Sequence, residues 1–450
     1  MIFFRSKIQS LLSLTGLKYD LLWSSIWATL AFFSSQSLIL VTNFLSAKFL
    51  GAEEYGVFSI LISSAQLISL VSTLGLHIIL PTQIAQSDNE HEKREMVANT
   101  LWITRALAIA IILVTVLFNR IAIEIIIGEQ SFFMLFMVST LLFFTYTESL
   151  VQTAIFSGFK KFDILFKSNV IKGGLVLLGT LLGAYYWGLN GTVFGFTGSS
   201  ITSNIVGRYF IKKHLASYSI TYDQYKKIAV NPAFMKAMKL AIPALKGSFV
   251  VIITNWLLLR LIIQYPNGFH ETGVYNIVNQ IKMLLLFLPS TLGFVLTPLL
   301  SSGDKLEKQI QMVLWVTGII VGVNLVTGLF IYIYATEILG FFGNDYLQNE
   351  ETLNVIVLTT IINASVIPMG NFMVAKGKLW LAFLFNSLWA IVQVVIAILL
   401  LEKDMGALGV AYASLISYVL HLGWTTLFFI SYCYKKRSTE FANDTEILVR

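Results

Sequence analysis

Twelve apolar segments of roughly twenty residues follow one another along the chain, and they constrain the fold more than any other feature. A helix of about twenty residues crosses the ~30 Å hydrocarbon core of a bilayer, and the alternating pattern of a β-barrel is missing. Hydrophobic residues make up 56% of the chain and charged residues 12%, unlike a water-soluble domain. The sequence therefore predicts an all-α polytopic membrane protein. The expected spans are 22–47, 57–80, 98–118, 131–157, 169–187, 191–210, 239–264, 274–300, 310–335, 352–375, 379–401 and 408–432.

A sequence repeat divides these spans into two sets of six. Three motifs recur in the same order at nearly the same offset (254 − 42 = 212, 271 − 54 = 217 and 406 − 188 = 218). They are Thr42-Asn43-Phe44-Leu45 with Thr254-Asn255-Trp256-Leu257, Glu54-Tyr55-Gly56-Val57-Phe58 with Glu271-Thr272-Gly273-Val274-Tyr275, and Gly188-Leu189-Asn190-Gly191 with Gly406-Ala407-Leu408-Gly409. An even number of spans per copy gives both copies the same topology, so we expect two six-helix lobes related by a pseudo-twofold axis along the membrane normal. The alternative is chance similarity between apolar helices.

The polar connections set the expected domain boundaries and orientation. We expect an N-terminal lobe at 1–210, a cytoplasmic linker at 211–238, a C-terminal lobe at 239–434 and a cytoplasmic tail at 435–450. Lys and Arg gather in the connections on one side, which places both termini in the cytoplasm. The net charge of +7 follows from this asymmetry and suits anionic membrane lipids, so no nucleic-acid partner is expected.

Motifs for catalysis or metal binding are missing from the sequence. The lone Cys433 excludes a cysteine metal cluster, and the five histidines are isolated from one another. No phosphate-binding glycine loop or zinc motif stands out, and no connection is long enough to be a folded domain. We therefore expect no metal, no cofactor and no enzymatic activity.

Polar residues inside the spans are the candidate site. Polar faces mark the first, second, seventh and eighth spans, which suits helices that line a hydrated cavity. The second span carries Ser59, Ser63 and Gln66. The residues singled out are Asn43, Asn255, Asn279 and Gln280; Ser25 and Ser248 share the stripes of the first and seventh spans. The alternative role is interhelical hydrogen bonding.

Cations inside the spans outnumber acidic residues. Lys48 and Arg260 occupy equivalent positions in the repeat, whereas Arg105 and Lys282 lie deeper in their spans. An excess of fixed positive charge suits an anionic substrate, because phosphate oxygens accept charge-assisted hydrogen bonds from Arg and Lys. Snorkelling of a long side chain toward the interface also explains Lys48 and Lys172. Glu148 is the candidate for proton or sodium coupling, with pairing to Arg105 as the alternative.

The chain resembles a known family in several loose motifs. Leu50-Gly51-Ala52-Glu53-Glu54-Tyr55-Gly56 after Lys48, and the later Gly75-Leu76, resemble the N-terminal signature of bacterial polysaccharide flippases of the O-antigen (Wzx) type, within the multidrug/oligosaccharidyl-lipid/polysaccharide exporter superfamily. The segment from Ile155 to Asp163 and Pro298-Leu299-Leu300 also resemble family segments. Leu259 departs from the family, whose members often carry an acidic residue at that place, and this puts an Asp-Arg pair there in doubt.

The resemblance implies a transport function in the bacterial plasma (inner) membrane. The expected substrate is an undecaprenyl-diphosphate-linked oligosaccharide repeat unit, moved from the inner to the outer leaflet for O-antigen or other surface polysaccharide synthesis. Other polysaccharide-assembly proteins are the expected partners, besides membrane lipids. Two alternatives remain: a cation-coupled multidrug exporter of the same superfamily, which calls for more acidic residues in its cavity, and a membrane oligosaccharide polymerase, which calls for a large outer loop.

Overall fold

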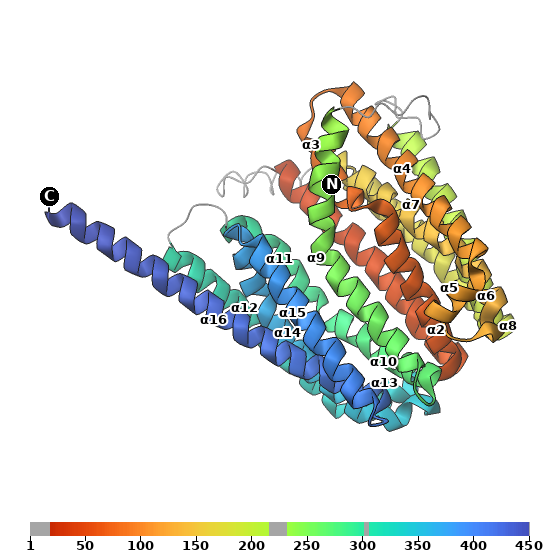
Figure 1. Cartoon of the computed structure of the whole chain (residues 1–450). Coiled ribbons are helices and arrows are strands. Elements are labelled where there is room, and N and C mark those ends of the chain that lie inside the picture. The colour runs from red at the N-terminus through yellow and green to blue at the C-terminus, as the bar shows by residue number, and fades with distance from the viewer. Residues whose placement is uncertain (1–18, 216–231, 301–305, 450) are drawn as a thin grey trace, which may run out of the picture. The chain divides into compact units, whose positions relative to one another are not determined.

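The computed structural model describes residues 19–215, 232–300 and 306–449, and these residues form helices joined by short turns, with no strand among them (Figure 1). Within this part of the chain, eight helices are long and apolar enough to cross a membrane. A ninth span results if the bent pair Ala237–Gly247 and Phe249–Ile263 is counted as one. The predicted all-α, multi-pass membrane class is therefore confirmed, while the number of twelve spans stays a prediction. Most of the predicted linker, at 216–231, lies outside the described residues.

The described chain divides into two compact units. The first contains residues up to Leu50 and Ile60–Phe249, and the second contains Gly51–Ser59 and Val250–Arg450. The helices that begin in the first unit are α2 (Tyr19–Thr73), α3 (Leu76–Gln86), α4 (Glu90–Leu117), α5 (Asn119–Ile126), η1 (Gln130–Phe132), α6 (Phe133–Ser139), α7 (Leu141–Gly158), α8 (Phe162–Leu215) and α9 (Pro232–Ile263). The second unit adds α10 (Gly268–Leu285), α11 (Phe287–Leu300), α12 (Leu306–Ile333), α13 (Ala335–Phe342), η3 (Asn344–Asn349), α14 (Glu350–Ala375), α15 (Leu379–Leu401) and α16 (Gly406–Val449).

These units differ from the predicted lobes in two places. Residues 51–59, at the centre of α2, pack in the second unit, and the first half of α9 packs in the first unit. There Phe234 and Ala241 form a small apolar core with Leu76 of α3. Gly75 allows the close approach, because a β-carbon on it would lie 2.3 Å from the Ala241 carbonyl oxygen. Each copy of the repeat thus contributes a segment to the unit that holds most of the other copy.

Two of the long helices are broken at glycines. Gly51 interrupts α2 with a φ of 74°, and Gly188 interrupts α8 with a φ of 55°. Both values lie in the left-handed region that glycine adopts without strain. The expected spans 169–187 and 191–210 leave only three residues between them, and α8 breaks at this place. The two arms of α8 then pack closely, since a β-carbon on Gly183 would lie 2.0 Å from the Gly191 carbonyl oxygen.

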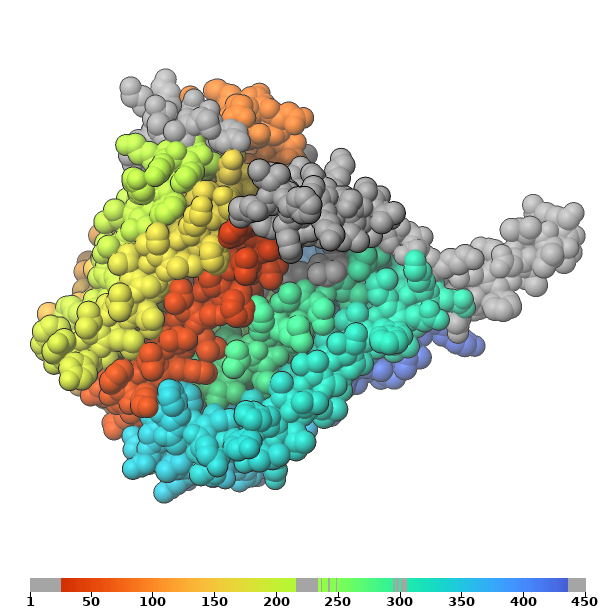
Figure 2. Space-filling view, turned by 180° about the vertical axis from the view of Figure 1, so that it is seen from behind, coloured from red at the N-terminus to blue at the C-terminus, as the bar shows by residue number. Residues whose placement is uncertain are grey.

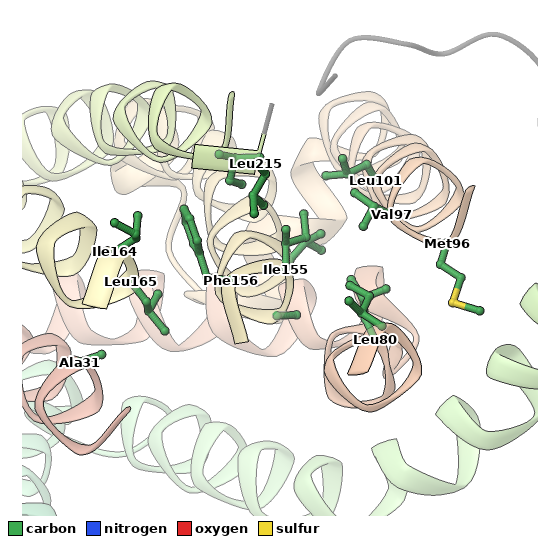
Figure 3. Packing of buried hydrophobic residues seen from close by; sticks show 14 residues of the cluster. Ala31, Leu80, Met96, Val97, Leu101, Ile155, Phe156, Ile164, Leu165 and Leu215 are labelled. Carbon is green, nitrogen blue, oxygen red and sulfur yellow. The ribbon is translucent and has the colours of Figure 1, made fainter. Parts of the chain in front are cut away.

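The core of the first unit lies where α7 packs against α3, α4 and α8 (Figure 3). Leu80 of α3, Leu101 of α4, and Ile155 and Phe156 of α7 are buried there. α2 joins this core through Ala31. This packing fixes the faces of α2, α7 and α8 that carry polar side chains.

In the second unit, α16 packs along both α14 and α15, and the three helices run side by side (Figure 1). The repeated glycine motif forms a second contact in this unit. A β-carbon on Gly56 would lie 1.8 Å from the carbonyl oxygen of Phe269, and one on Gly273 would lie 1.9 Å from that of Ala52. Each glycine therefore faces the carbonyl of the residue four positions before the other glycine. The two copies of the motif contact each other in the same way in both directions.

Candidate functional site

A buried carboxylate with two arginines forms the electrostatic centre of the first unit. Glu148 of α7 is 1% exposed and Arg105 of α4 is 7% exposed. Arg105 donates from Nε to Oε1 of Glu148 and from Nη2 to Oε2, the latter at 3.1 Å. Arg208 of α8 lies on the other side, with its Nε 3.6 Å from Oε2 of Glu148. The pairing of Glu148 with Arg105, which the sequence left open as the alternative to ion coupling, is present.

A hydrogen-bond network continues from this carboxylate along α7 and α8. Lys172 donates from Nζ to Ser149 Oγ at 3.2 Å and to Gln152 Oε1 at 3.0 Å. Gln152 in turn donates from Nε2 to the Asn204 carbonyl oxygen at 3.1 Å. Gly207 makes room for this amide, because a β-carbon there would lie 1.9 Å from Gln152 Oε1. Lys172 is thereby held on the side of α8 that faces α7.

A pocket of about 150 Å³ opens beside this network. Its walls come from α2, α7 and α8, and Asn43, Gln66, Thr145, Asn169 and Ser203 supply amide and hydroxyl groups. The walls of α2 and α8 meet closely, since Asn169 donates to the Ala31 carbonyl oxygen at 3.0 Å. Figure 2 shows the first part of α2 (red) beside the first part of α8 (yellow).

The pocket carries positive charge. Lys172 is the charged residue among those that line it. Behind it, Glu148 faces two arginines, so three cations accompany one carboxylate in this region. Neutral donors and acceptors with a surplus cation suit an anionic, hydroxyl-rich ligand, since a charged donor forms the stronger hydrogen bonds with oxyanions. A cationic ligand would meet repulsion instead.

The residues predicted as a site are divided between the two units. In the first unit, Asn43 lines the pocket, Arg105 and Glu148 form the buried pair, and Lys48 is exposed. In the second unit, Lys282 is buried. Four further residues there are partly exposed: Asn255, Arg260, Asn279 and Gln280. Within the described side chains, Gln280 Nε2 lies 3.5 Å from Asn276 Oδ1. The side chains of Ser25 and Ser248 lie outside the described part.

Two cations of the site were missed or undervalued from the sequence. Lys172 was explained by snorkelling because it stands near the start of the expected span 169–187, but α8 begins at Phe162, ten residues before Lys172. Arg208 was not singled out, because it stands near the end of the span 191–210, whereas α8 continues to Leu215. The signal for Arg208 was its spacing of four from Asn204, which places both on one face of the helix. Among the described residues, no group of three or more His, Cys, Asp or Glu side chains could hold a metal ion.

Comparison with solved structures identifies proteins of similar fold. An inward-facing multidrug resistance MATE family transporter of the MOP superfamily has a TM-score of 0.74 at 14% identity, covering 91% of this chain and 99% of its own. The lipid II flippase MurJ in an inward closed conformation has a TM-score of 0.71 at 15% identity, covering 90% and 87%. At these identities the likeness shows the fold alone. Both of these proteins are described as transport proteins, a transporter and a flippase.

Comparison of sequences identifies the protein family as well as the fold. The EPS I polysaccharide export inner membrane protein EpsE of Ralstonia solanacearum is 20% identical over 197 residues, which is 42% of this chain and 44% of that protein. The chain therefore matches less than half the length of this relative. The family model described as "Polysaccharide biosynthesis protein" matches residues 21–304, more than half of the chain. The chain thus belongs to the polysaccharide biosynthesis protein family.

Proposed function

We propose that this protein flips a lipid-linked oligosaccharide, namely an undecaprenyl-diphosphate-linked repeat unit, from the inner to the outer leaflet of a bacterial plasma membrane. The observation that carries the proposal is the pocket of the first unit, which combines amide and hydroxyl groups with Lys172 as its charged residue. Family membership and the polysaccharide export relative support the polysaccharide class, and MurJ supports a lipid-linked headgroup. The product serves O-antigen or another surface polysaccharide.

The substrate divides into parts that need different surroundings. Sugar hydroxyls pair with side chains such as Asn43 and Asn169, which both donate and accept hydrogen bonds. The diphosphate binds a cation within the spans, for which Lys172 of the first unit or Arg260 of the second unit is the candidate. The polyprenyl tail stays in lipid. Alternation between inward-open and outward-open states moves the headgroup across the membrane, and both termini remain cytoplasmic.

Coupling to a proton or to sodium is assigned to Glu148. In its ion pair with Arg105 the carboxylate is fully engaged, so ion binding requires the pair to separate. Arg208 offers the carboxylate a second partner at 3.6 Å. Exchange of Glu148 between these two arginines is the motion that we associate with coupling.

A multidrug exporter is the second candidate, because a MATE transporter shares the fold with a TM-score of 0.74. The fold does not separate the two functions, since MurJ matches nearly as well at 0.71. The charge of the binding pocket distinguishes a multidrug exporter from a flippase of an anionic substrate. Cationic drugs call for acidic residues in the binding pocket, and the acidic residue nearest to this pocket is already paired with Arg105.

The test is surface polysaccharide in a bacterium whose own copy of the gene is deleted and replaced by variants. Alanine at Arg260 should abolish the polymer while the protein remains in the membrane at near-normal amount. Alanine at Arg105 should abolish the polymer too, but there the amount of protein should also fall, because the buried pair with Glu148 is broken. Lysine at either position should restore only part of it, because lysine lacks the bidentate fork of arginine. Normal polymer in the alanine variants would remove both residues from the mechanism. Efflux of a cationic dye, undiminished in these variants, would support the exporter.

A further inference from the structure

A buried ammonium group that has no counter-charge among the described side chains lies in the second unit. Lys282 stands in the last turn of α10 and is 8% exposed. Its Nζ lies 4.8 Å from the centre of the Tyr418 ring, on α16. In the described part of the chain, no carboxylate forms an ion pair with it. A tyrosine face stabilises a cation by about 0.5–2 kcal/mol, far less than the hydration that a buried ammonium loses.

Two aromatic side chains that pack on Tyr418 carry ring nitrogens without a hydrogen-bond partner in the described structure. Trp389 of α15 packs on Tyr418 with ring centres 5.1 Å apart, and His421 packs on it at 6.2 Å. Trp389 is 4% exposed and His421 is 7% exposed. Trp389 Nε1 and His421 Nδ1 are buried with no hydrogen-bond partner among the described atoms. An indole N–H can only donate, and buried donors are normally satisfied.

One more unsatisfied donor borders the cluster. Trp424 stands 5.7 Å from His421 between ring centres, and its Nε1 also lacks a partner in the described structure. Trp424 is partly exposed, so the cluster is not sealed on that side. A cation from α10 and two indole donors, from α15 and α16, gather here, and neither indole has an acceptor among the described atoms. A chemical group that fits must bring negative charge and several acceptor atoms.

We propose that Lys282, Trp389, Tyr418 and His421 form a binding site for one oxyanion, the charged group of a carboxylate or a phosphate. Lys282 supplies the charge and Trp389 and His421 supply directed hydrogen bonds, while the Tyr418 ring positions the lysine. This inference rests on the proposed function for the source of the oxyanion, which is an acidic sugar of the lipid-linked oligosaccharide. Free phosphate is the other source of the same chemistry.

The test measures binding to the full chain, purified in lipid nanodiscs, by the thermal unfolding midpoint. Glucuronate, inorganic phosphate and glucose are compared as probes at constant ionic strength with sodium chloride. We expect a saturable rise in the midpoint with an oxyanion and none with glucose. Lys282→Gln should weaken that binding roughly tenfold or more, in line with the loss of a hydrogen bond to a charged group. Trp389→Phe keeps the ring but removes the donor, so it should weaken binding by less.

Matched variants separate binding from folding. Lys403 and Trp380 are exposed in the same unit, so Lys403→Gln and Trp380→Phe should leave binding unchanged. Lys282→Arg keeps the charge and should retain binding even if Lys282→Gln unfolds. A response to glucuronate alone identifies the acidic sugar as the source, and a response to phosphate identifies a phosphate group. An equal response to glucose, or unchanged oxyanion binding in Lys282→Gln, overturns the site. Loss of surface polysaccharide is scored separately, so bound oxyanion without any flipping counts against the proposed function and not against the site.

Discussion

Alanine at Gly56 should destabilise the protein, although alanine forms helices more readily than glycine. The new β-carbon would lie 1.8 Å from the Phe269 carbonyl oxygen, about half of the ~3.5 Å at which heavy atoms make contact. The obstacle is the backbone of α10, so relief requires a helix to move. Overpacking costs about 1–3 kcal/mol, and a contact this short belongs at the upper end. The gain in helix propensity is about 1 kcal/mol, which leaves a net loss of about 2 kcal/mol.

The same argument applies to Gly273→Ala, whose β-carbon would meet the Ala52 carbonyl oxygen at 1.9 Å. One displacement of the helices relieves both contacts, so the double variant should lose less than the sum of the single losses. The assay is the temperature at which purified protein loses its monodisperse peak in size-exclusion chromatography. Gly322→Ala in α12 is the matched control, because nothing lies within 4 Å of its β-carbon. If Gly56→Ala proved as stable as this control, the close contact would not exist in the protein.

Three other perturbations test the charged groups. Glu148→Gln should destabilise the first unit by roughly 3–5 kcal/mol in thermal unfolding, because Arg105 is left as an uncompensated buried charge; an unchanged midpoint would show that the pair is not formed. Lys172→Gln should reduce surface polysaccharide at near-normal protein amount, whereas the exposed Lys167→Gln should not, and equal yields would exclude the pocket from transport. The Glu271 carboxylate, whose Oε1 lies 3.6 Å from His270 Nδ1, raises the pKa of the imidazole. The stabilisation from this pair is complete below the unfolded pKa of about 6.5 and is lost as pH rises through the higher folded pKa. Wild-type protein should therefore unfold at a higher temperature at pH 5.5 than at pH 8, and His270→Gln should lose that difference; a variant with the same pH dependence would assign it to other groups.

The sequence predicted the class of fold well, because the length and number of apolar segments report directly on the membrane, whereas the orientation inferred from Lys and Arg stays a prediction. It also predicted the Glu148–Arg105 pair as an open alternative, since two ionisable groups inside spans seldom remain apart. The sequence analysis assigned Lys172 to the membrane interface and did not single out Arg208, and both errors have the same cause. Hydropathy measures where a segment is apolar and not where a helix ends, and α8 extends past the apolar segment at both ends.

The cluster of Lys282 with Trp389, Tyr418 and His421 could not be predicted from the sequence. Lys282 was singled out as a deep cation, but Trp389 and His421 come from positions more than a hundred residues away. Aromatic residues in membrane helices are too common to mark a site by themselves. The glycine contact shows the same limit. The repeat made Gly56 and Gly273 visible as equivalents, yet only packing shows that each faces the other copy's carbonyl.

The exchange of segments between the two units determines where the gene for this chain can be divided. A fragment that stops at residue 210 would lack Phe234 and Ala241, which cover Leu76. A fragment that starts at residue 239 would lack 51–59, which pack in the second unit. Neither copy of the repeat is therefore a self-sufficient folding unit. A gene split within the segment for 216–231 should yield two polypeptides that must be made together, each completing the hydrophobic core of the other.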